Sequence, residues 1–142
     1  MINNLYKRIL VTGANGFIGK NLITKLNELE NYDIITFNRE NELKELNKIV
    51  SKSDVVIHLA GENRPENISD FSKVNSLLTK ELCKTIEKTG RNIPLIFSSS
   101  VQAEDDNPYG LSKKEAENTI ISFHKKTRNP CVIYRLPGVF GK

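Results

Sequence analysis

Tyr109 and Lys113 lie four residues apart in the stretch NPYGLSK, which begins like a helix. Side chains at positions i and i+4 of a helix lie one turn apart on the same face, so the phenol and the ammonium group would be neighbours. Free tyrosine has a pKa of about 10, and a nearby ammonium group lowers that pKa by stabilising the phenolate. The pair could therefore donate and accept a proton. Taken alone, the spacing is also typical of an ordinary amphipathic helix.

Three hydroxyl groups, those of Ser98, Ser99 and Ser100, end the apolar run NIPLIFSSS before this helix. A buried strand has no packing reason to end in three serines, and α/β folds bind ligands at the carboxyl edge of the sheet. The serines therefore predict a Ser–Tyr–Lys site. In such a site Ser100 would hydrogen-bond the substrate oxygen, Tyr109 would transfer the proton, and Lys113 would also hold a cofactor ribose.

Short apolar runs alternate with segments of helical spacing along the chain. The predicted strands are 7–13, 32–38, 53–61, 92–100 and 131–138, and the predicted helices are 17–29, 43–50, 68–86 and 108–126. Apolar strands separated by helices indicate a parallel sheet covered on both faces. We predict an α/β fold, a doubly wound Rossmann-like parallel sheet with helices on both faces. Only one helix fits between the second and third strands, so the short outer strand common in such folds is expected to be missing.

The loop GANGFIG carries glycines at 13, 16 and 19, directly after a predicted strand and at the start of a predicted helix. Gly13 would permit a tight turn, and Gly19 would let helix and strand pack closely. Gly16 would let the backbone approach a diphosphate at the helix N-terminus, where N–H groups and the helix dipole favour anions. The alternative is a glycine-rich turn with no ligand, but the strand–loop–helix context favours a dinucleotide.

The residues after the second predicted strand bear on the choice of dinucleotide. Asn38 stands where NAD-binding folds carry an acidic residue for the ribose hydroxyls, and Arg39 follows it. Without a carboxylate to repel a 2′-phosphate, and with Arg39 able to pair with it, NADP(H) is favoured and NAD(H) stays possible. The alternative is that Arg39 is merely exposed.

Composition narrows the class of protein. The 142 residues match one domain, and 38% hydrophobic with 27% charged residues is typical of a globular chain. The net charge of +4 comes from lysines scattered near glutamates, which indicates solvated helix faces, not a nucleic-acid site. Cys83 and Cys131 form no CxxC motif, and the two histidines are isolated, so no metal site is predicted. No signal peptide or spanning segment is apparent, so a cytoplasmic location is expected.

The motifs GANGFIG, HLAG, VNSLLTKEL, IFSSS, YGLSK and YRLPGVFG, between residues 9 and 141, together resemble the extended short-chain dehydrogenase/reductases that act on nucleotide sugars. Within that superfamily, HLAGENRPEN (58–67) and SSSVQAEDDNPYGLSK (98–113) are most similar to the capsular-polysaccharide reductases of the CapF type. The resemblance implies NADPH-dependent reduction of a UDP-2-acetamido-2,6-dideoxy-4-hexulose. Those reductases also lack the short outer strand.

The resemblance also implies roles for individual residues. The catalytic residues would be Ser100, Tyr109 and Lys113. Leu59, Ala60 and Gly61 would line the cofactor, Asn75 would support the site, and Pro137 and Val139 would flank the nicotinamide. The full set expected at the cofactor is Gly13, Asn15, Gly16, Phe17, Ile18, Gly19, Asn38, Arg39, Leu59, Ala60, Gly61, Asn75, Ser98, Tyr109, Lys113, Pro137 and Val139.

Two departures from the superfamily qualify this interpretation. Sugar 4,6-dehydratases carry an Asp-Glu pair directly after the catalytic hydroxyl, whereas Val101 and Gln102 stand here and cannot do acid–base work. Dehydration of that kind is therefore not expected. The family also continues beyond the point corresponding to Lys142, so residues 1–142 are expected to be a dinucleotide-binding domain that stops before most of the sugar-binding region.

Two other functions stay open from the sequence. An NAD-dependent 4-epimerase uses the same three catalytic residues, although Asn38 and Arg39 count against tight use of NAD. A non-catalytic NADP(H) sensor is the alternative of another class, and the presence of both Tyr109 and Lys113 counts against it. The expected partners are a UDP-sugar and, in the full-length protein, a second copy in a homodimer, with no nucleic acid and no membrane.

Overall fold

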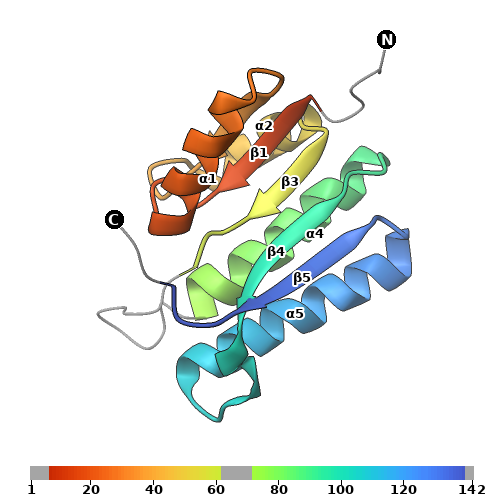
Figure 1. The fold of residues 1–142 in the computed structure, drawn as a ribbon. Helices are drawn as coiled ribbons and strands as arrows, with labels where there is room; N and C mark the ends of the chain where they lie inside the picture. Colours follow the sequence, from red (N-terminus) through yellow and green to blue (C-terminus); the bar gives the residue numbers. More distant parts are fainter. Residues whose placement is uncertain (1–6, 62–71, 140–142) are drawn as a thin grey trace.

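A five-stranded parallel sheet forms the centre of the chain, in the strand order β2-β1-β3-β4-β5 (Figure 1). The computed structural model describes residues 7–61 and 72–139, with the backbone alone described for 72–74. The strands are β1 (Arg8–Thr12), β2 (Asp33–Phe37), β3 (Val55–His58), β4 (Leu95–Ser100) and β5 (Cys131–Leu136). Each lies within a predicted apolar run, so the predicted fold class is confirmed.

The register brings the carboxyl ends of the strands to one edge of the sheet. Thr12 pairs with Phe37 on one side and with His58 on the other, and Ser100 pairs with Leu136. The chain leaves β1 toward β2, then crosses back to place β3 on the opposite side of β1. Such a reversal opens a crevice at the carboxyl edge, where doubly wound folds bind ligands.

Helices cover both faces of the sheet. The side chains of α1 (Phe17–Glu28) pack with Ile9 and Val11 of β1, whereas α2 (Leu46–Ser51), α4 (Leu78–Thr89) and α5 (Pro108–Thr127) contribute to the larger core cluster on the other face. Three short elements complete the described chain: η1 (Leu43–Glu45) and η3 (Val101–Glu104) are 3-10 turns, and η2 (Ser72–Leu77) is π-helical. None of the helices in the described ranges has the length and hydrophobicity to cross a membrane.

The predicted helix boundaries hold with two qualifications. The predicted helix 43–50 appears as η1 followed by α2. Residues 38–54 contain no strand, as expected for a sheet without the short outer strand. The predicted helix 68–86 appears as η2 followed by α4, which ends at Gly90 in a left-handed conformation. The first residues of that prediction, and positions 62–67 of the HLAGENRPEN motif, lie outside the described residues.

Two glycines of the first loop are required by their surroundings. Gly13 has a φ of +68°, and a Cβ there would lie 2.7 Å from the Ala60 amide nitrogen. A Cβ on Gly19 would lie 2.3 Å from the Gly13 carbonyl oxygen, so α1 approaches β1 closely only because residue 19 has no side chain. Both observations match the roles predicted for the tight turn and the helix–strand contact.

Gly19→Ala should therefore destabilise the fold by about 1–3 kcal/mol, the usual cost of overpacking, because α1 must shift away from the loop. Urea unfolding followed by circular dichroism measures this loss. Gly16→Ala is the matched control, since the Cβ at Gly16 would meet only the Gly13 oxygen, at 3.4 Å. Its cost should stay below about 1 kcal/mol, that of an unfavourable N-cap residue. Equal losses in the two variants would contradict the packing argument.

Candidate active site

The N-terminus of α5 carries Tyr109 and Lys113 and is fixed by two local features. The Asn107 side chain caps the helix by accepting a hydrogen bond from the Gly110 amide at 2.8 Å, and Pro108 occupies the first turn. A Cβ on Gly110 would lie 2.1 Å from the Gln102 carbonyl oxygen, so the helix packs directly on the backbone of η3. This role of Gly110 was not predicted from the sequence. A glycine inside a helical pattern was the available signal.

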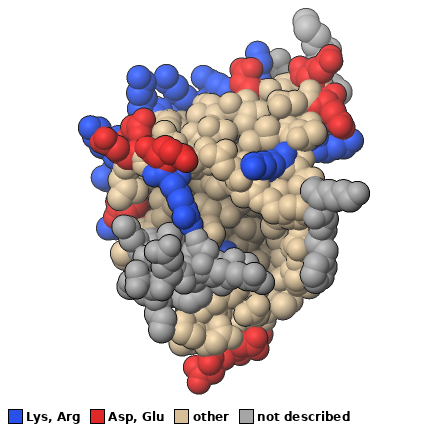
Figure 2. Space-filling view, turned by 90° about the vertical axis from the view of Figure 1, so that its left-hand side faces the viewer, with Lys and Arg blue, Asp and Glu red and all other residues tan. Residues whose placement is uncertain are grey.

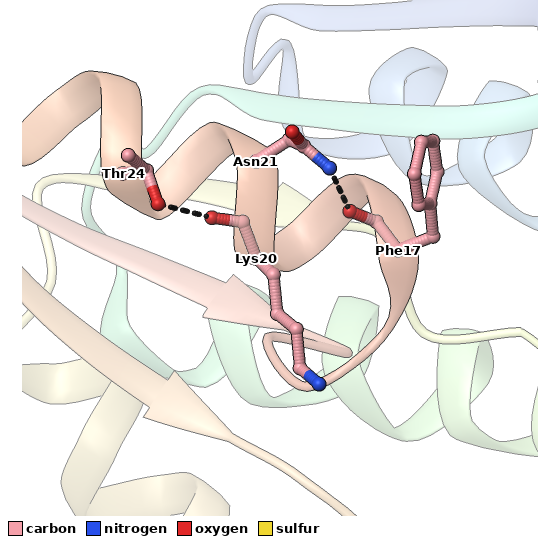
Figure 3. A pocket seen from close by; sticks show the side chains of 4 residues that line it. All are labelled: Phe17, Lys20, Asn21 and Thr24. Carbon is pink, nitrogen blue, oxygen red and sulfur yellow. Dashed lines mark hydrogen bonds between the residues drawn. The ribbon is translucent and has the colours of Figure 1, made fainter. Parts of the chain in front are cut away.

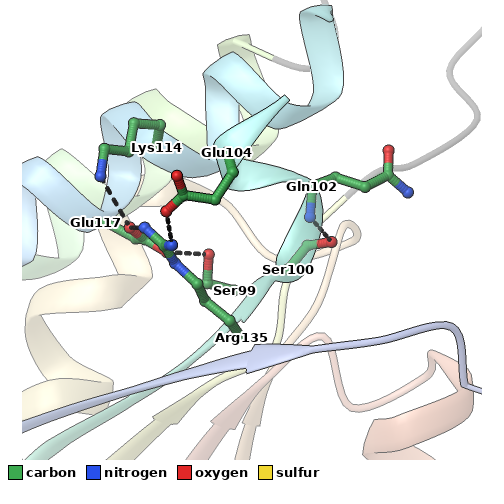
Figure 4. A network of polar contacts seen from close by, with 7 residues as sticks. All are labelled: Ser99, Ser100, Gln102, Glu104, Lys114, Glu117 and Arg135. Atoms are coloured by element: carbon green, nitrogen blue, oxygen red, sulfur yellow. Dashed lines mark hydrogen bonds and ion pairs between the residues drawn. The ribbon is translucent and has the colours of Figure 1, made fainter. Parts of the chain in front are cut away.

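The three predicted catalytic residues come together at this point. The Tyr109 phenol lies beside Ser100, at the carboxyl end of β4, close enough for Ser100 to act on its pKa. The Lys113 Nζ lies 5.9 Å from the centroid of the Tyr109 ring. The Ser100 hydroxyl also accepts a hydrogen bond from the Gln102 amide at 3.1 Å, which holds it at the start of η3 (Figure 4). The Gln102 side chain points away from Ser100 in the same view.

Lys113 is a buried cation with only 4% of its surface exposed. Its Nζ donates a hydrogen bond to the Ser98 carbonyl oxygen at 3.0 Å and lies 5.0 Å from the centroid of the Phe97 ring. Burial lowers the pKa of Lys113 to about 8, and the negative charge of Glu117 opposes that shift. Ser98 therefore contributes its backbone carbonyl to the site.

The pKa of Tyr109 differs from the sequence-based expectation. Burial raises the pKa of the phenol above its ordinary value, and the hydrogen bond with Ser100 offsets only part of that rise. The expected lowering by Lys113 is thus not what the structure shows, because desolvation of the phenolate outweighs the stabilising contacts. A phenol in this environment holds its proton at neutral pH and is suited to donate it.

Asn75 joins η2 to α5 beneath Tyr109. Its side-chain amide donates to the Ser112 hydroxyl at 2.9 Å, and that hydroxyl donates to the Tyr109 carbonyl oxygen at 2.7 Å. A Cβ on Gly61 would lie 2.9 Å from the Asn75 Oδ1 and 3.0 Å from the Lys113 Nζ. With glycine at residue 61, the backbone after β3 approaches both polar groups without displacing their side chains.

His58 is a further residue of this region that the sequence analysis did not assign. The Thr12 hydroxyl oxygen accepts hydrogen bonds from the amides of Leu59 and Ala60, each at 3.1 Å. Its own hydrogen is therefore donated to the His58 Nδ1, 2.6 Å away, which makes Nε2 the protonated nitrogen. That nitrogen donates to Thr79, and the Thr79 hydroxyl donates to the Asn75 carbonyl oxygen.

The start of α1 fits a dinucleotide diphosphate. The first turn of α1 contains no acidic residue, and no side chain caps it. A Cβ on Gly16 would meet one atom, the Gly13 carbonyl oxygen at 3.4 Å, so the Gly16 backbone leaves room for the close approach of an anion. The Asn15 amide donates to the Asn38 Oδ1 at 3.3 Å, which links the glycine loop to the segment after β2. The loop and the segment predicted to bind the adenosine ribose therefore lie side by side.

The remaining predicted cofactor residues lie around this edge. Phe17 and Arg39 are exposed, Ile18, Leu59 and Ala60 are half-buried, and Pro137 and Val139 are exposed after the carboxyl end of β5. A shallow hollow of about 530 Å³ on α1 is lined by Phe17, Lys20, Asn21 and Thr24 (Figure 3). Asn21 and Thr24 donate hydrogen bonds to carbonyls of the same helix. The hollow is thus a groove along α1 and is distinct from the Tyr109–Lys113 region.

Surface charge is mixed on the face that Figure 2 draws, where Asp and Glu side chains lie among Lys and Arg. The surface is hollowed near the centre of this view, which looks at the side toward which the strands of Figure 1 run. Among the described residues, no group of three His, Cys, Asp or Glu side chains could hold a metal ion.

Comparison with known proteins decides the family. Residues 9–142 match the NAD dependent epimerase/dehydratase family. The chain belongs to this family. Because the family is NAD dependent, a nicotinamide dinucleotide is its class of cofactor, in agreement with the glycine loop.

Alignments with individual relatives cover most of this chain. It is 45% identical over 135 residues to a UDP-2-acetamido-2,6-beta-L-arabino-hexul-4-ose reductase of Pseudomonas aeruginosa, covering 95% of this chain and 36% of that protein. It is 28% identical over 95% of its length to a UDP-glucose 4-epimerase of Vibrio cholerae, of which it covers 52%. The crystal structure of the capsular polysaccharide assembling protein CapF from Staphylococcus aureus superposes with a TM-score of 0.81 at 36% identity, covering 94% of this chain and 36% of that one. The predicted resemblance is confirmed.

The buried His58 predicts a specific pH dependence of stability. Burial, followed by the positive charge of Lys113, lowers the pKa of His58 from 6.5 to about 3. Between these values the unfolded chain binds a proton that the folded chain does not. Stability should therefore fall as the pH falls, by up to about 1.4 kcal/mol per pH unit from this residue.

Urea unfolding between pH 7 and pH 4 measures that slope. His58→Gln should flatten it, whereas the control His124→Gln, which alters the exposed histidine near the C-terminal end of α5, should keep it. An acid slope that is the same in the wild type and His58→Gln would show that His58 is not held neutral.

Proposed function

We propose that the chain is the cofactor-binding part of an NADPH-dependent reductase that acts on a 4-keto nucleotide sugar of the UDP-2-acetamido-2,6-dideoxy-hexulose type, in surface polysaccharide biosynthesis. The observation that carries the proposal is the convergence of Ser100, Tyr109 and Lys113 at the carboxyl end of β4. The 45% identity to a UDP-sugar reductase supports the choice of reaction and substrate.

In the proposed reaction, Tyr109 donates its proton to the carbonyl oxygen of the sugar. A nicotinamide cofactor, when bound, supplies the hydride. Ser100, beside the phenol, orients that oxygen. The Lys113 ammonium group stabilises the phenolate that remains and holds the ribose hydroxyls. The raised pKa of Tyr109 favours this direction, since the phenol is protonated before the reaction begins.

The alternatives are a 4-epimerase and a non-catalytic NADP(H) sensor. A third reaction of related enzymes, dehydration, is not proposed, because Val101 and Gln102 follow Ser100 and neither can act as acid or base. An epimerase would use the same three residues and a tightly held NAD, which Asn38 and Arg39 do not favour. A sensor would need neither the phenol nor the buried ammonium group. The contacts of Tyr109 and Lys113 therefore support an enzyme.

The extent of the chain affects how the proposal is tested. These 142 residues span 36% of the Pseudomonas reductase, so we place most of the sugar-binding region in a longer protein. The longer protein is proposed to act in the cytoplasm as a homodimer. Cofactor binding can be measured on the chain itself, whereas turnover requires a protein that carries these residues together with a sugar-binding region.

Cofactor choice can be tested by calorimetric titration of the 142-residue chain with NADPH and NADH. NADPH should bind more tightly, and Arg39→Ala should weaken NADPH about tenfold or more while leaving NADH nearly unchanged, because a charged hydrogen bond to the 2′-phosphate contributes about 1.5–3 kcal/mol. Arg128→Asn removes an exposed arginine at the opposite edge of the sheet and should change neither affinity. Equal affinities for the two cofactors in the wild type would refute the choice of NADPH.

The proton donor can be tested by Tyr109→Phe in a protein with the sugar-binding region. The variant keeps the ring but loses the hydroxyl, so reduction should fall by about 10²–10⁴-fold while NADPH affinity is retained. Stopped-flow measurement of NADPH oxidation and a parallel binding titration give the two quantities. Tyr134→Phe is the control, because Tyr134 lies on β5 with 57% of its surface exposed. Near-normal turnover by Tyr109→Phe would contradict the assigned role.

A further inference from the structure

Glu117 is a buried carboxylate directly behind the catalytic residues. It lies on α5, four residues after Lys113 and eight after Tyr109, on the same face of the helix. Only 3% of its surface is exposed, which is unusual for glutamate unless its charge is paired. The proposed reaction does not use this side chain directly.

The carboxylate joins three elements of the fold (Figure 4). Arg135 of β5 donates to both oxygens, from Nε to Oε1 and from Nη2 to Oε2, each at 2.8 Å. The Ser99 hydroxyl of β4 donates to Oε1 at 2.7 Å. Lys114 Nζ lies 3.8 Å from Oε2, and Arg135 forms a second ion pair with Glu104 of η3. Burial alone would raise the pKa of Glu117, but the hydrogen bonds from Arg135 and Ser99 hold it below its ordinary value.

The bond to Ser99 restrains the part of β4 that forms the catalytic site. Ser99 lies between Ser98, whose carbonyl accepts the hydrogen bond from Lys113, and Ser100, which lies beside the Tyr109 phenol. Successive side chains of a strand project from one extended backbone to alternate faces. Fixing the Ser99 side chain therefore also restrains the orientations of Ser98 and Ser100. The Ser99 hydroxyl thus has a structural role that the sequence analysis did not foresee.

Glu117 also acts on the charge of Lys113. The groups around the Lys113 ammonium come from four elements: Glu117 and Tyr109 of α5, the Ser98 carbonyl and the Phe97 ring of β4, neutral His58 of β3, and the Asn75 amide beside Gly61. Glu117 is the carboxylate of this set. Its charge opposes the effect of burial, which by itself favours the neutral amine.

We propose that Glu117 is a positioning residue for the reaction: it clamps the end of β4 through Ser99 and Arg135, and it places a negative charge one helical turn from the buried Lys113 ammonium group. The catalytic part of this inference rests on the proposed function. Its two physical parts can be measured without turnover.

The test is an NMR titration of the lysine side chains of the chain, labelled with ¹³C at Cε, between pH 6 and pH 11. The Lys113 signal is identified by its absence from Lys113→Met. Glu117→Gln keeps the shape of the side chain but removes its charge, so Lys113 should titrate at a lower pH than in the wild type, by about half a pH unit or more. A carboxylate that merely supports the fold would not move this titration.

Glu104→Gln is the matched control, because Glu104 pairs with the same arginine but has a side chain that is 68% exposed and lies on η3. Lys113 should titrate in Glu104→Gln as it does in the wild type. If Glu117→Gln does not fold, Arg135→Gln removes the positive charge that offsets Glu117 and should move the Lys113 titration in the opposite direction, to a higher pH. A Lys113 titration at its wild-type pH in a folded Glu117→Gln or Arg135→Gln variant would overturn the proposal.

The clamp has its own readout in the protein with the sugar-binding region. Ser99→Ala removes the hydroxyl that joins β4 to Glu117 but leaves every charge in place. The value of kcat should fall about tenfold with KM for NADPH little changed, and the Lys113 titration should stay at its wild-type pH. An unchanged kcat would refute the clamp. An inactive wild type would instead refute the proposed reductase, and the lysine titration would still decide whether Glu117 sustains the charge of Lys113.

Discussion

Burial of the Lys113 ammonium group is the constraint on which the rest of the site depends. A cation with 4% exposure loses most of its hydration, so the protein must supply other partners. The Ser98 carbonyl, the Phe97 ring and the charge of Glu117 do so from two sides. Because these partners belong to β4 and α5, the sheet edge and the helix start are held in one relative position. Tyr109 lies on the same helix as Lys113, so its position is fixed as well.

Close backbone approach is the second requirement, and glycines meet it at several points. Gly13 and Gly19 let α1 pack on β1 beside the backbone of residues 59 and 60. Gly61 leaves room for the polar ends of Asn75 and Lys113, and Gly110 lets α5 rest on η3. In each case a methyl group would lie within about 3 Å of an existing atom, which proteins do not tolerate without a shift. The glycine loop and α5 thus meet the same edge of the sheet.

Two polar connections run behind the site, and they differ in charge. The path from Thr12 through His58 and Thr79 to the Asn75 carbonyl is neutral, and its hydrogen-bond directions allow one tautomer of His58. The connection from Ser99 through Glu117 to Arg135 is ionic. The neutral path joins β1 and β3 to η2, and the ionic one joins β4 and β5 to α5. A protonated His58 would add a second positive charge near Lys113, so the neutral path also limits repulsion at the site.

The sequence by itself determined the order of strands and helices along the chain and the glycine loop, and it predicted the group of Ser100, Tyr109 and Lys113 that the structure brings together, because periodicity, turn residues and motif spacing are local properties. It could not determine the electrostatics. Tyr109 and Lys113 predicted a lowered phenol pKa, whereas burial raises it, and burial is known only once the packing of distant segments is fixed. The same holds for His58 and Glu117, whose partners lie 46 and 18 residues away in sequence. Their roles arise from parallel strands that bring distant residues to one edge of the sheet, and tertiary structure alone decides which residues meet there.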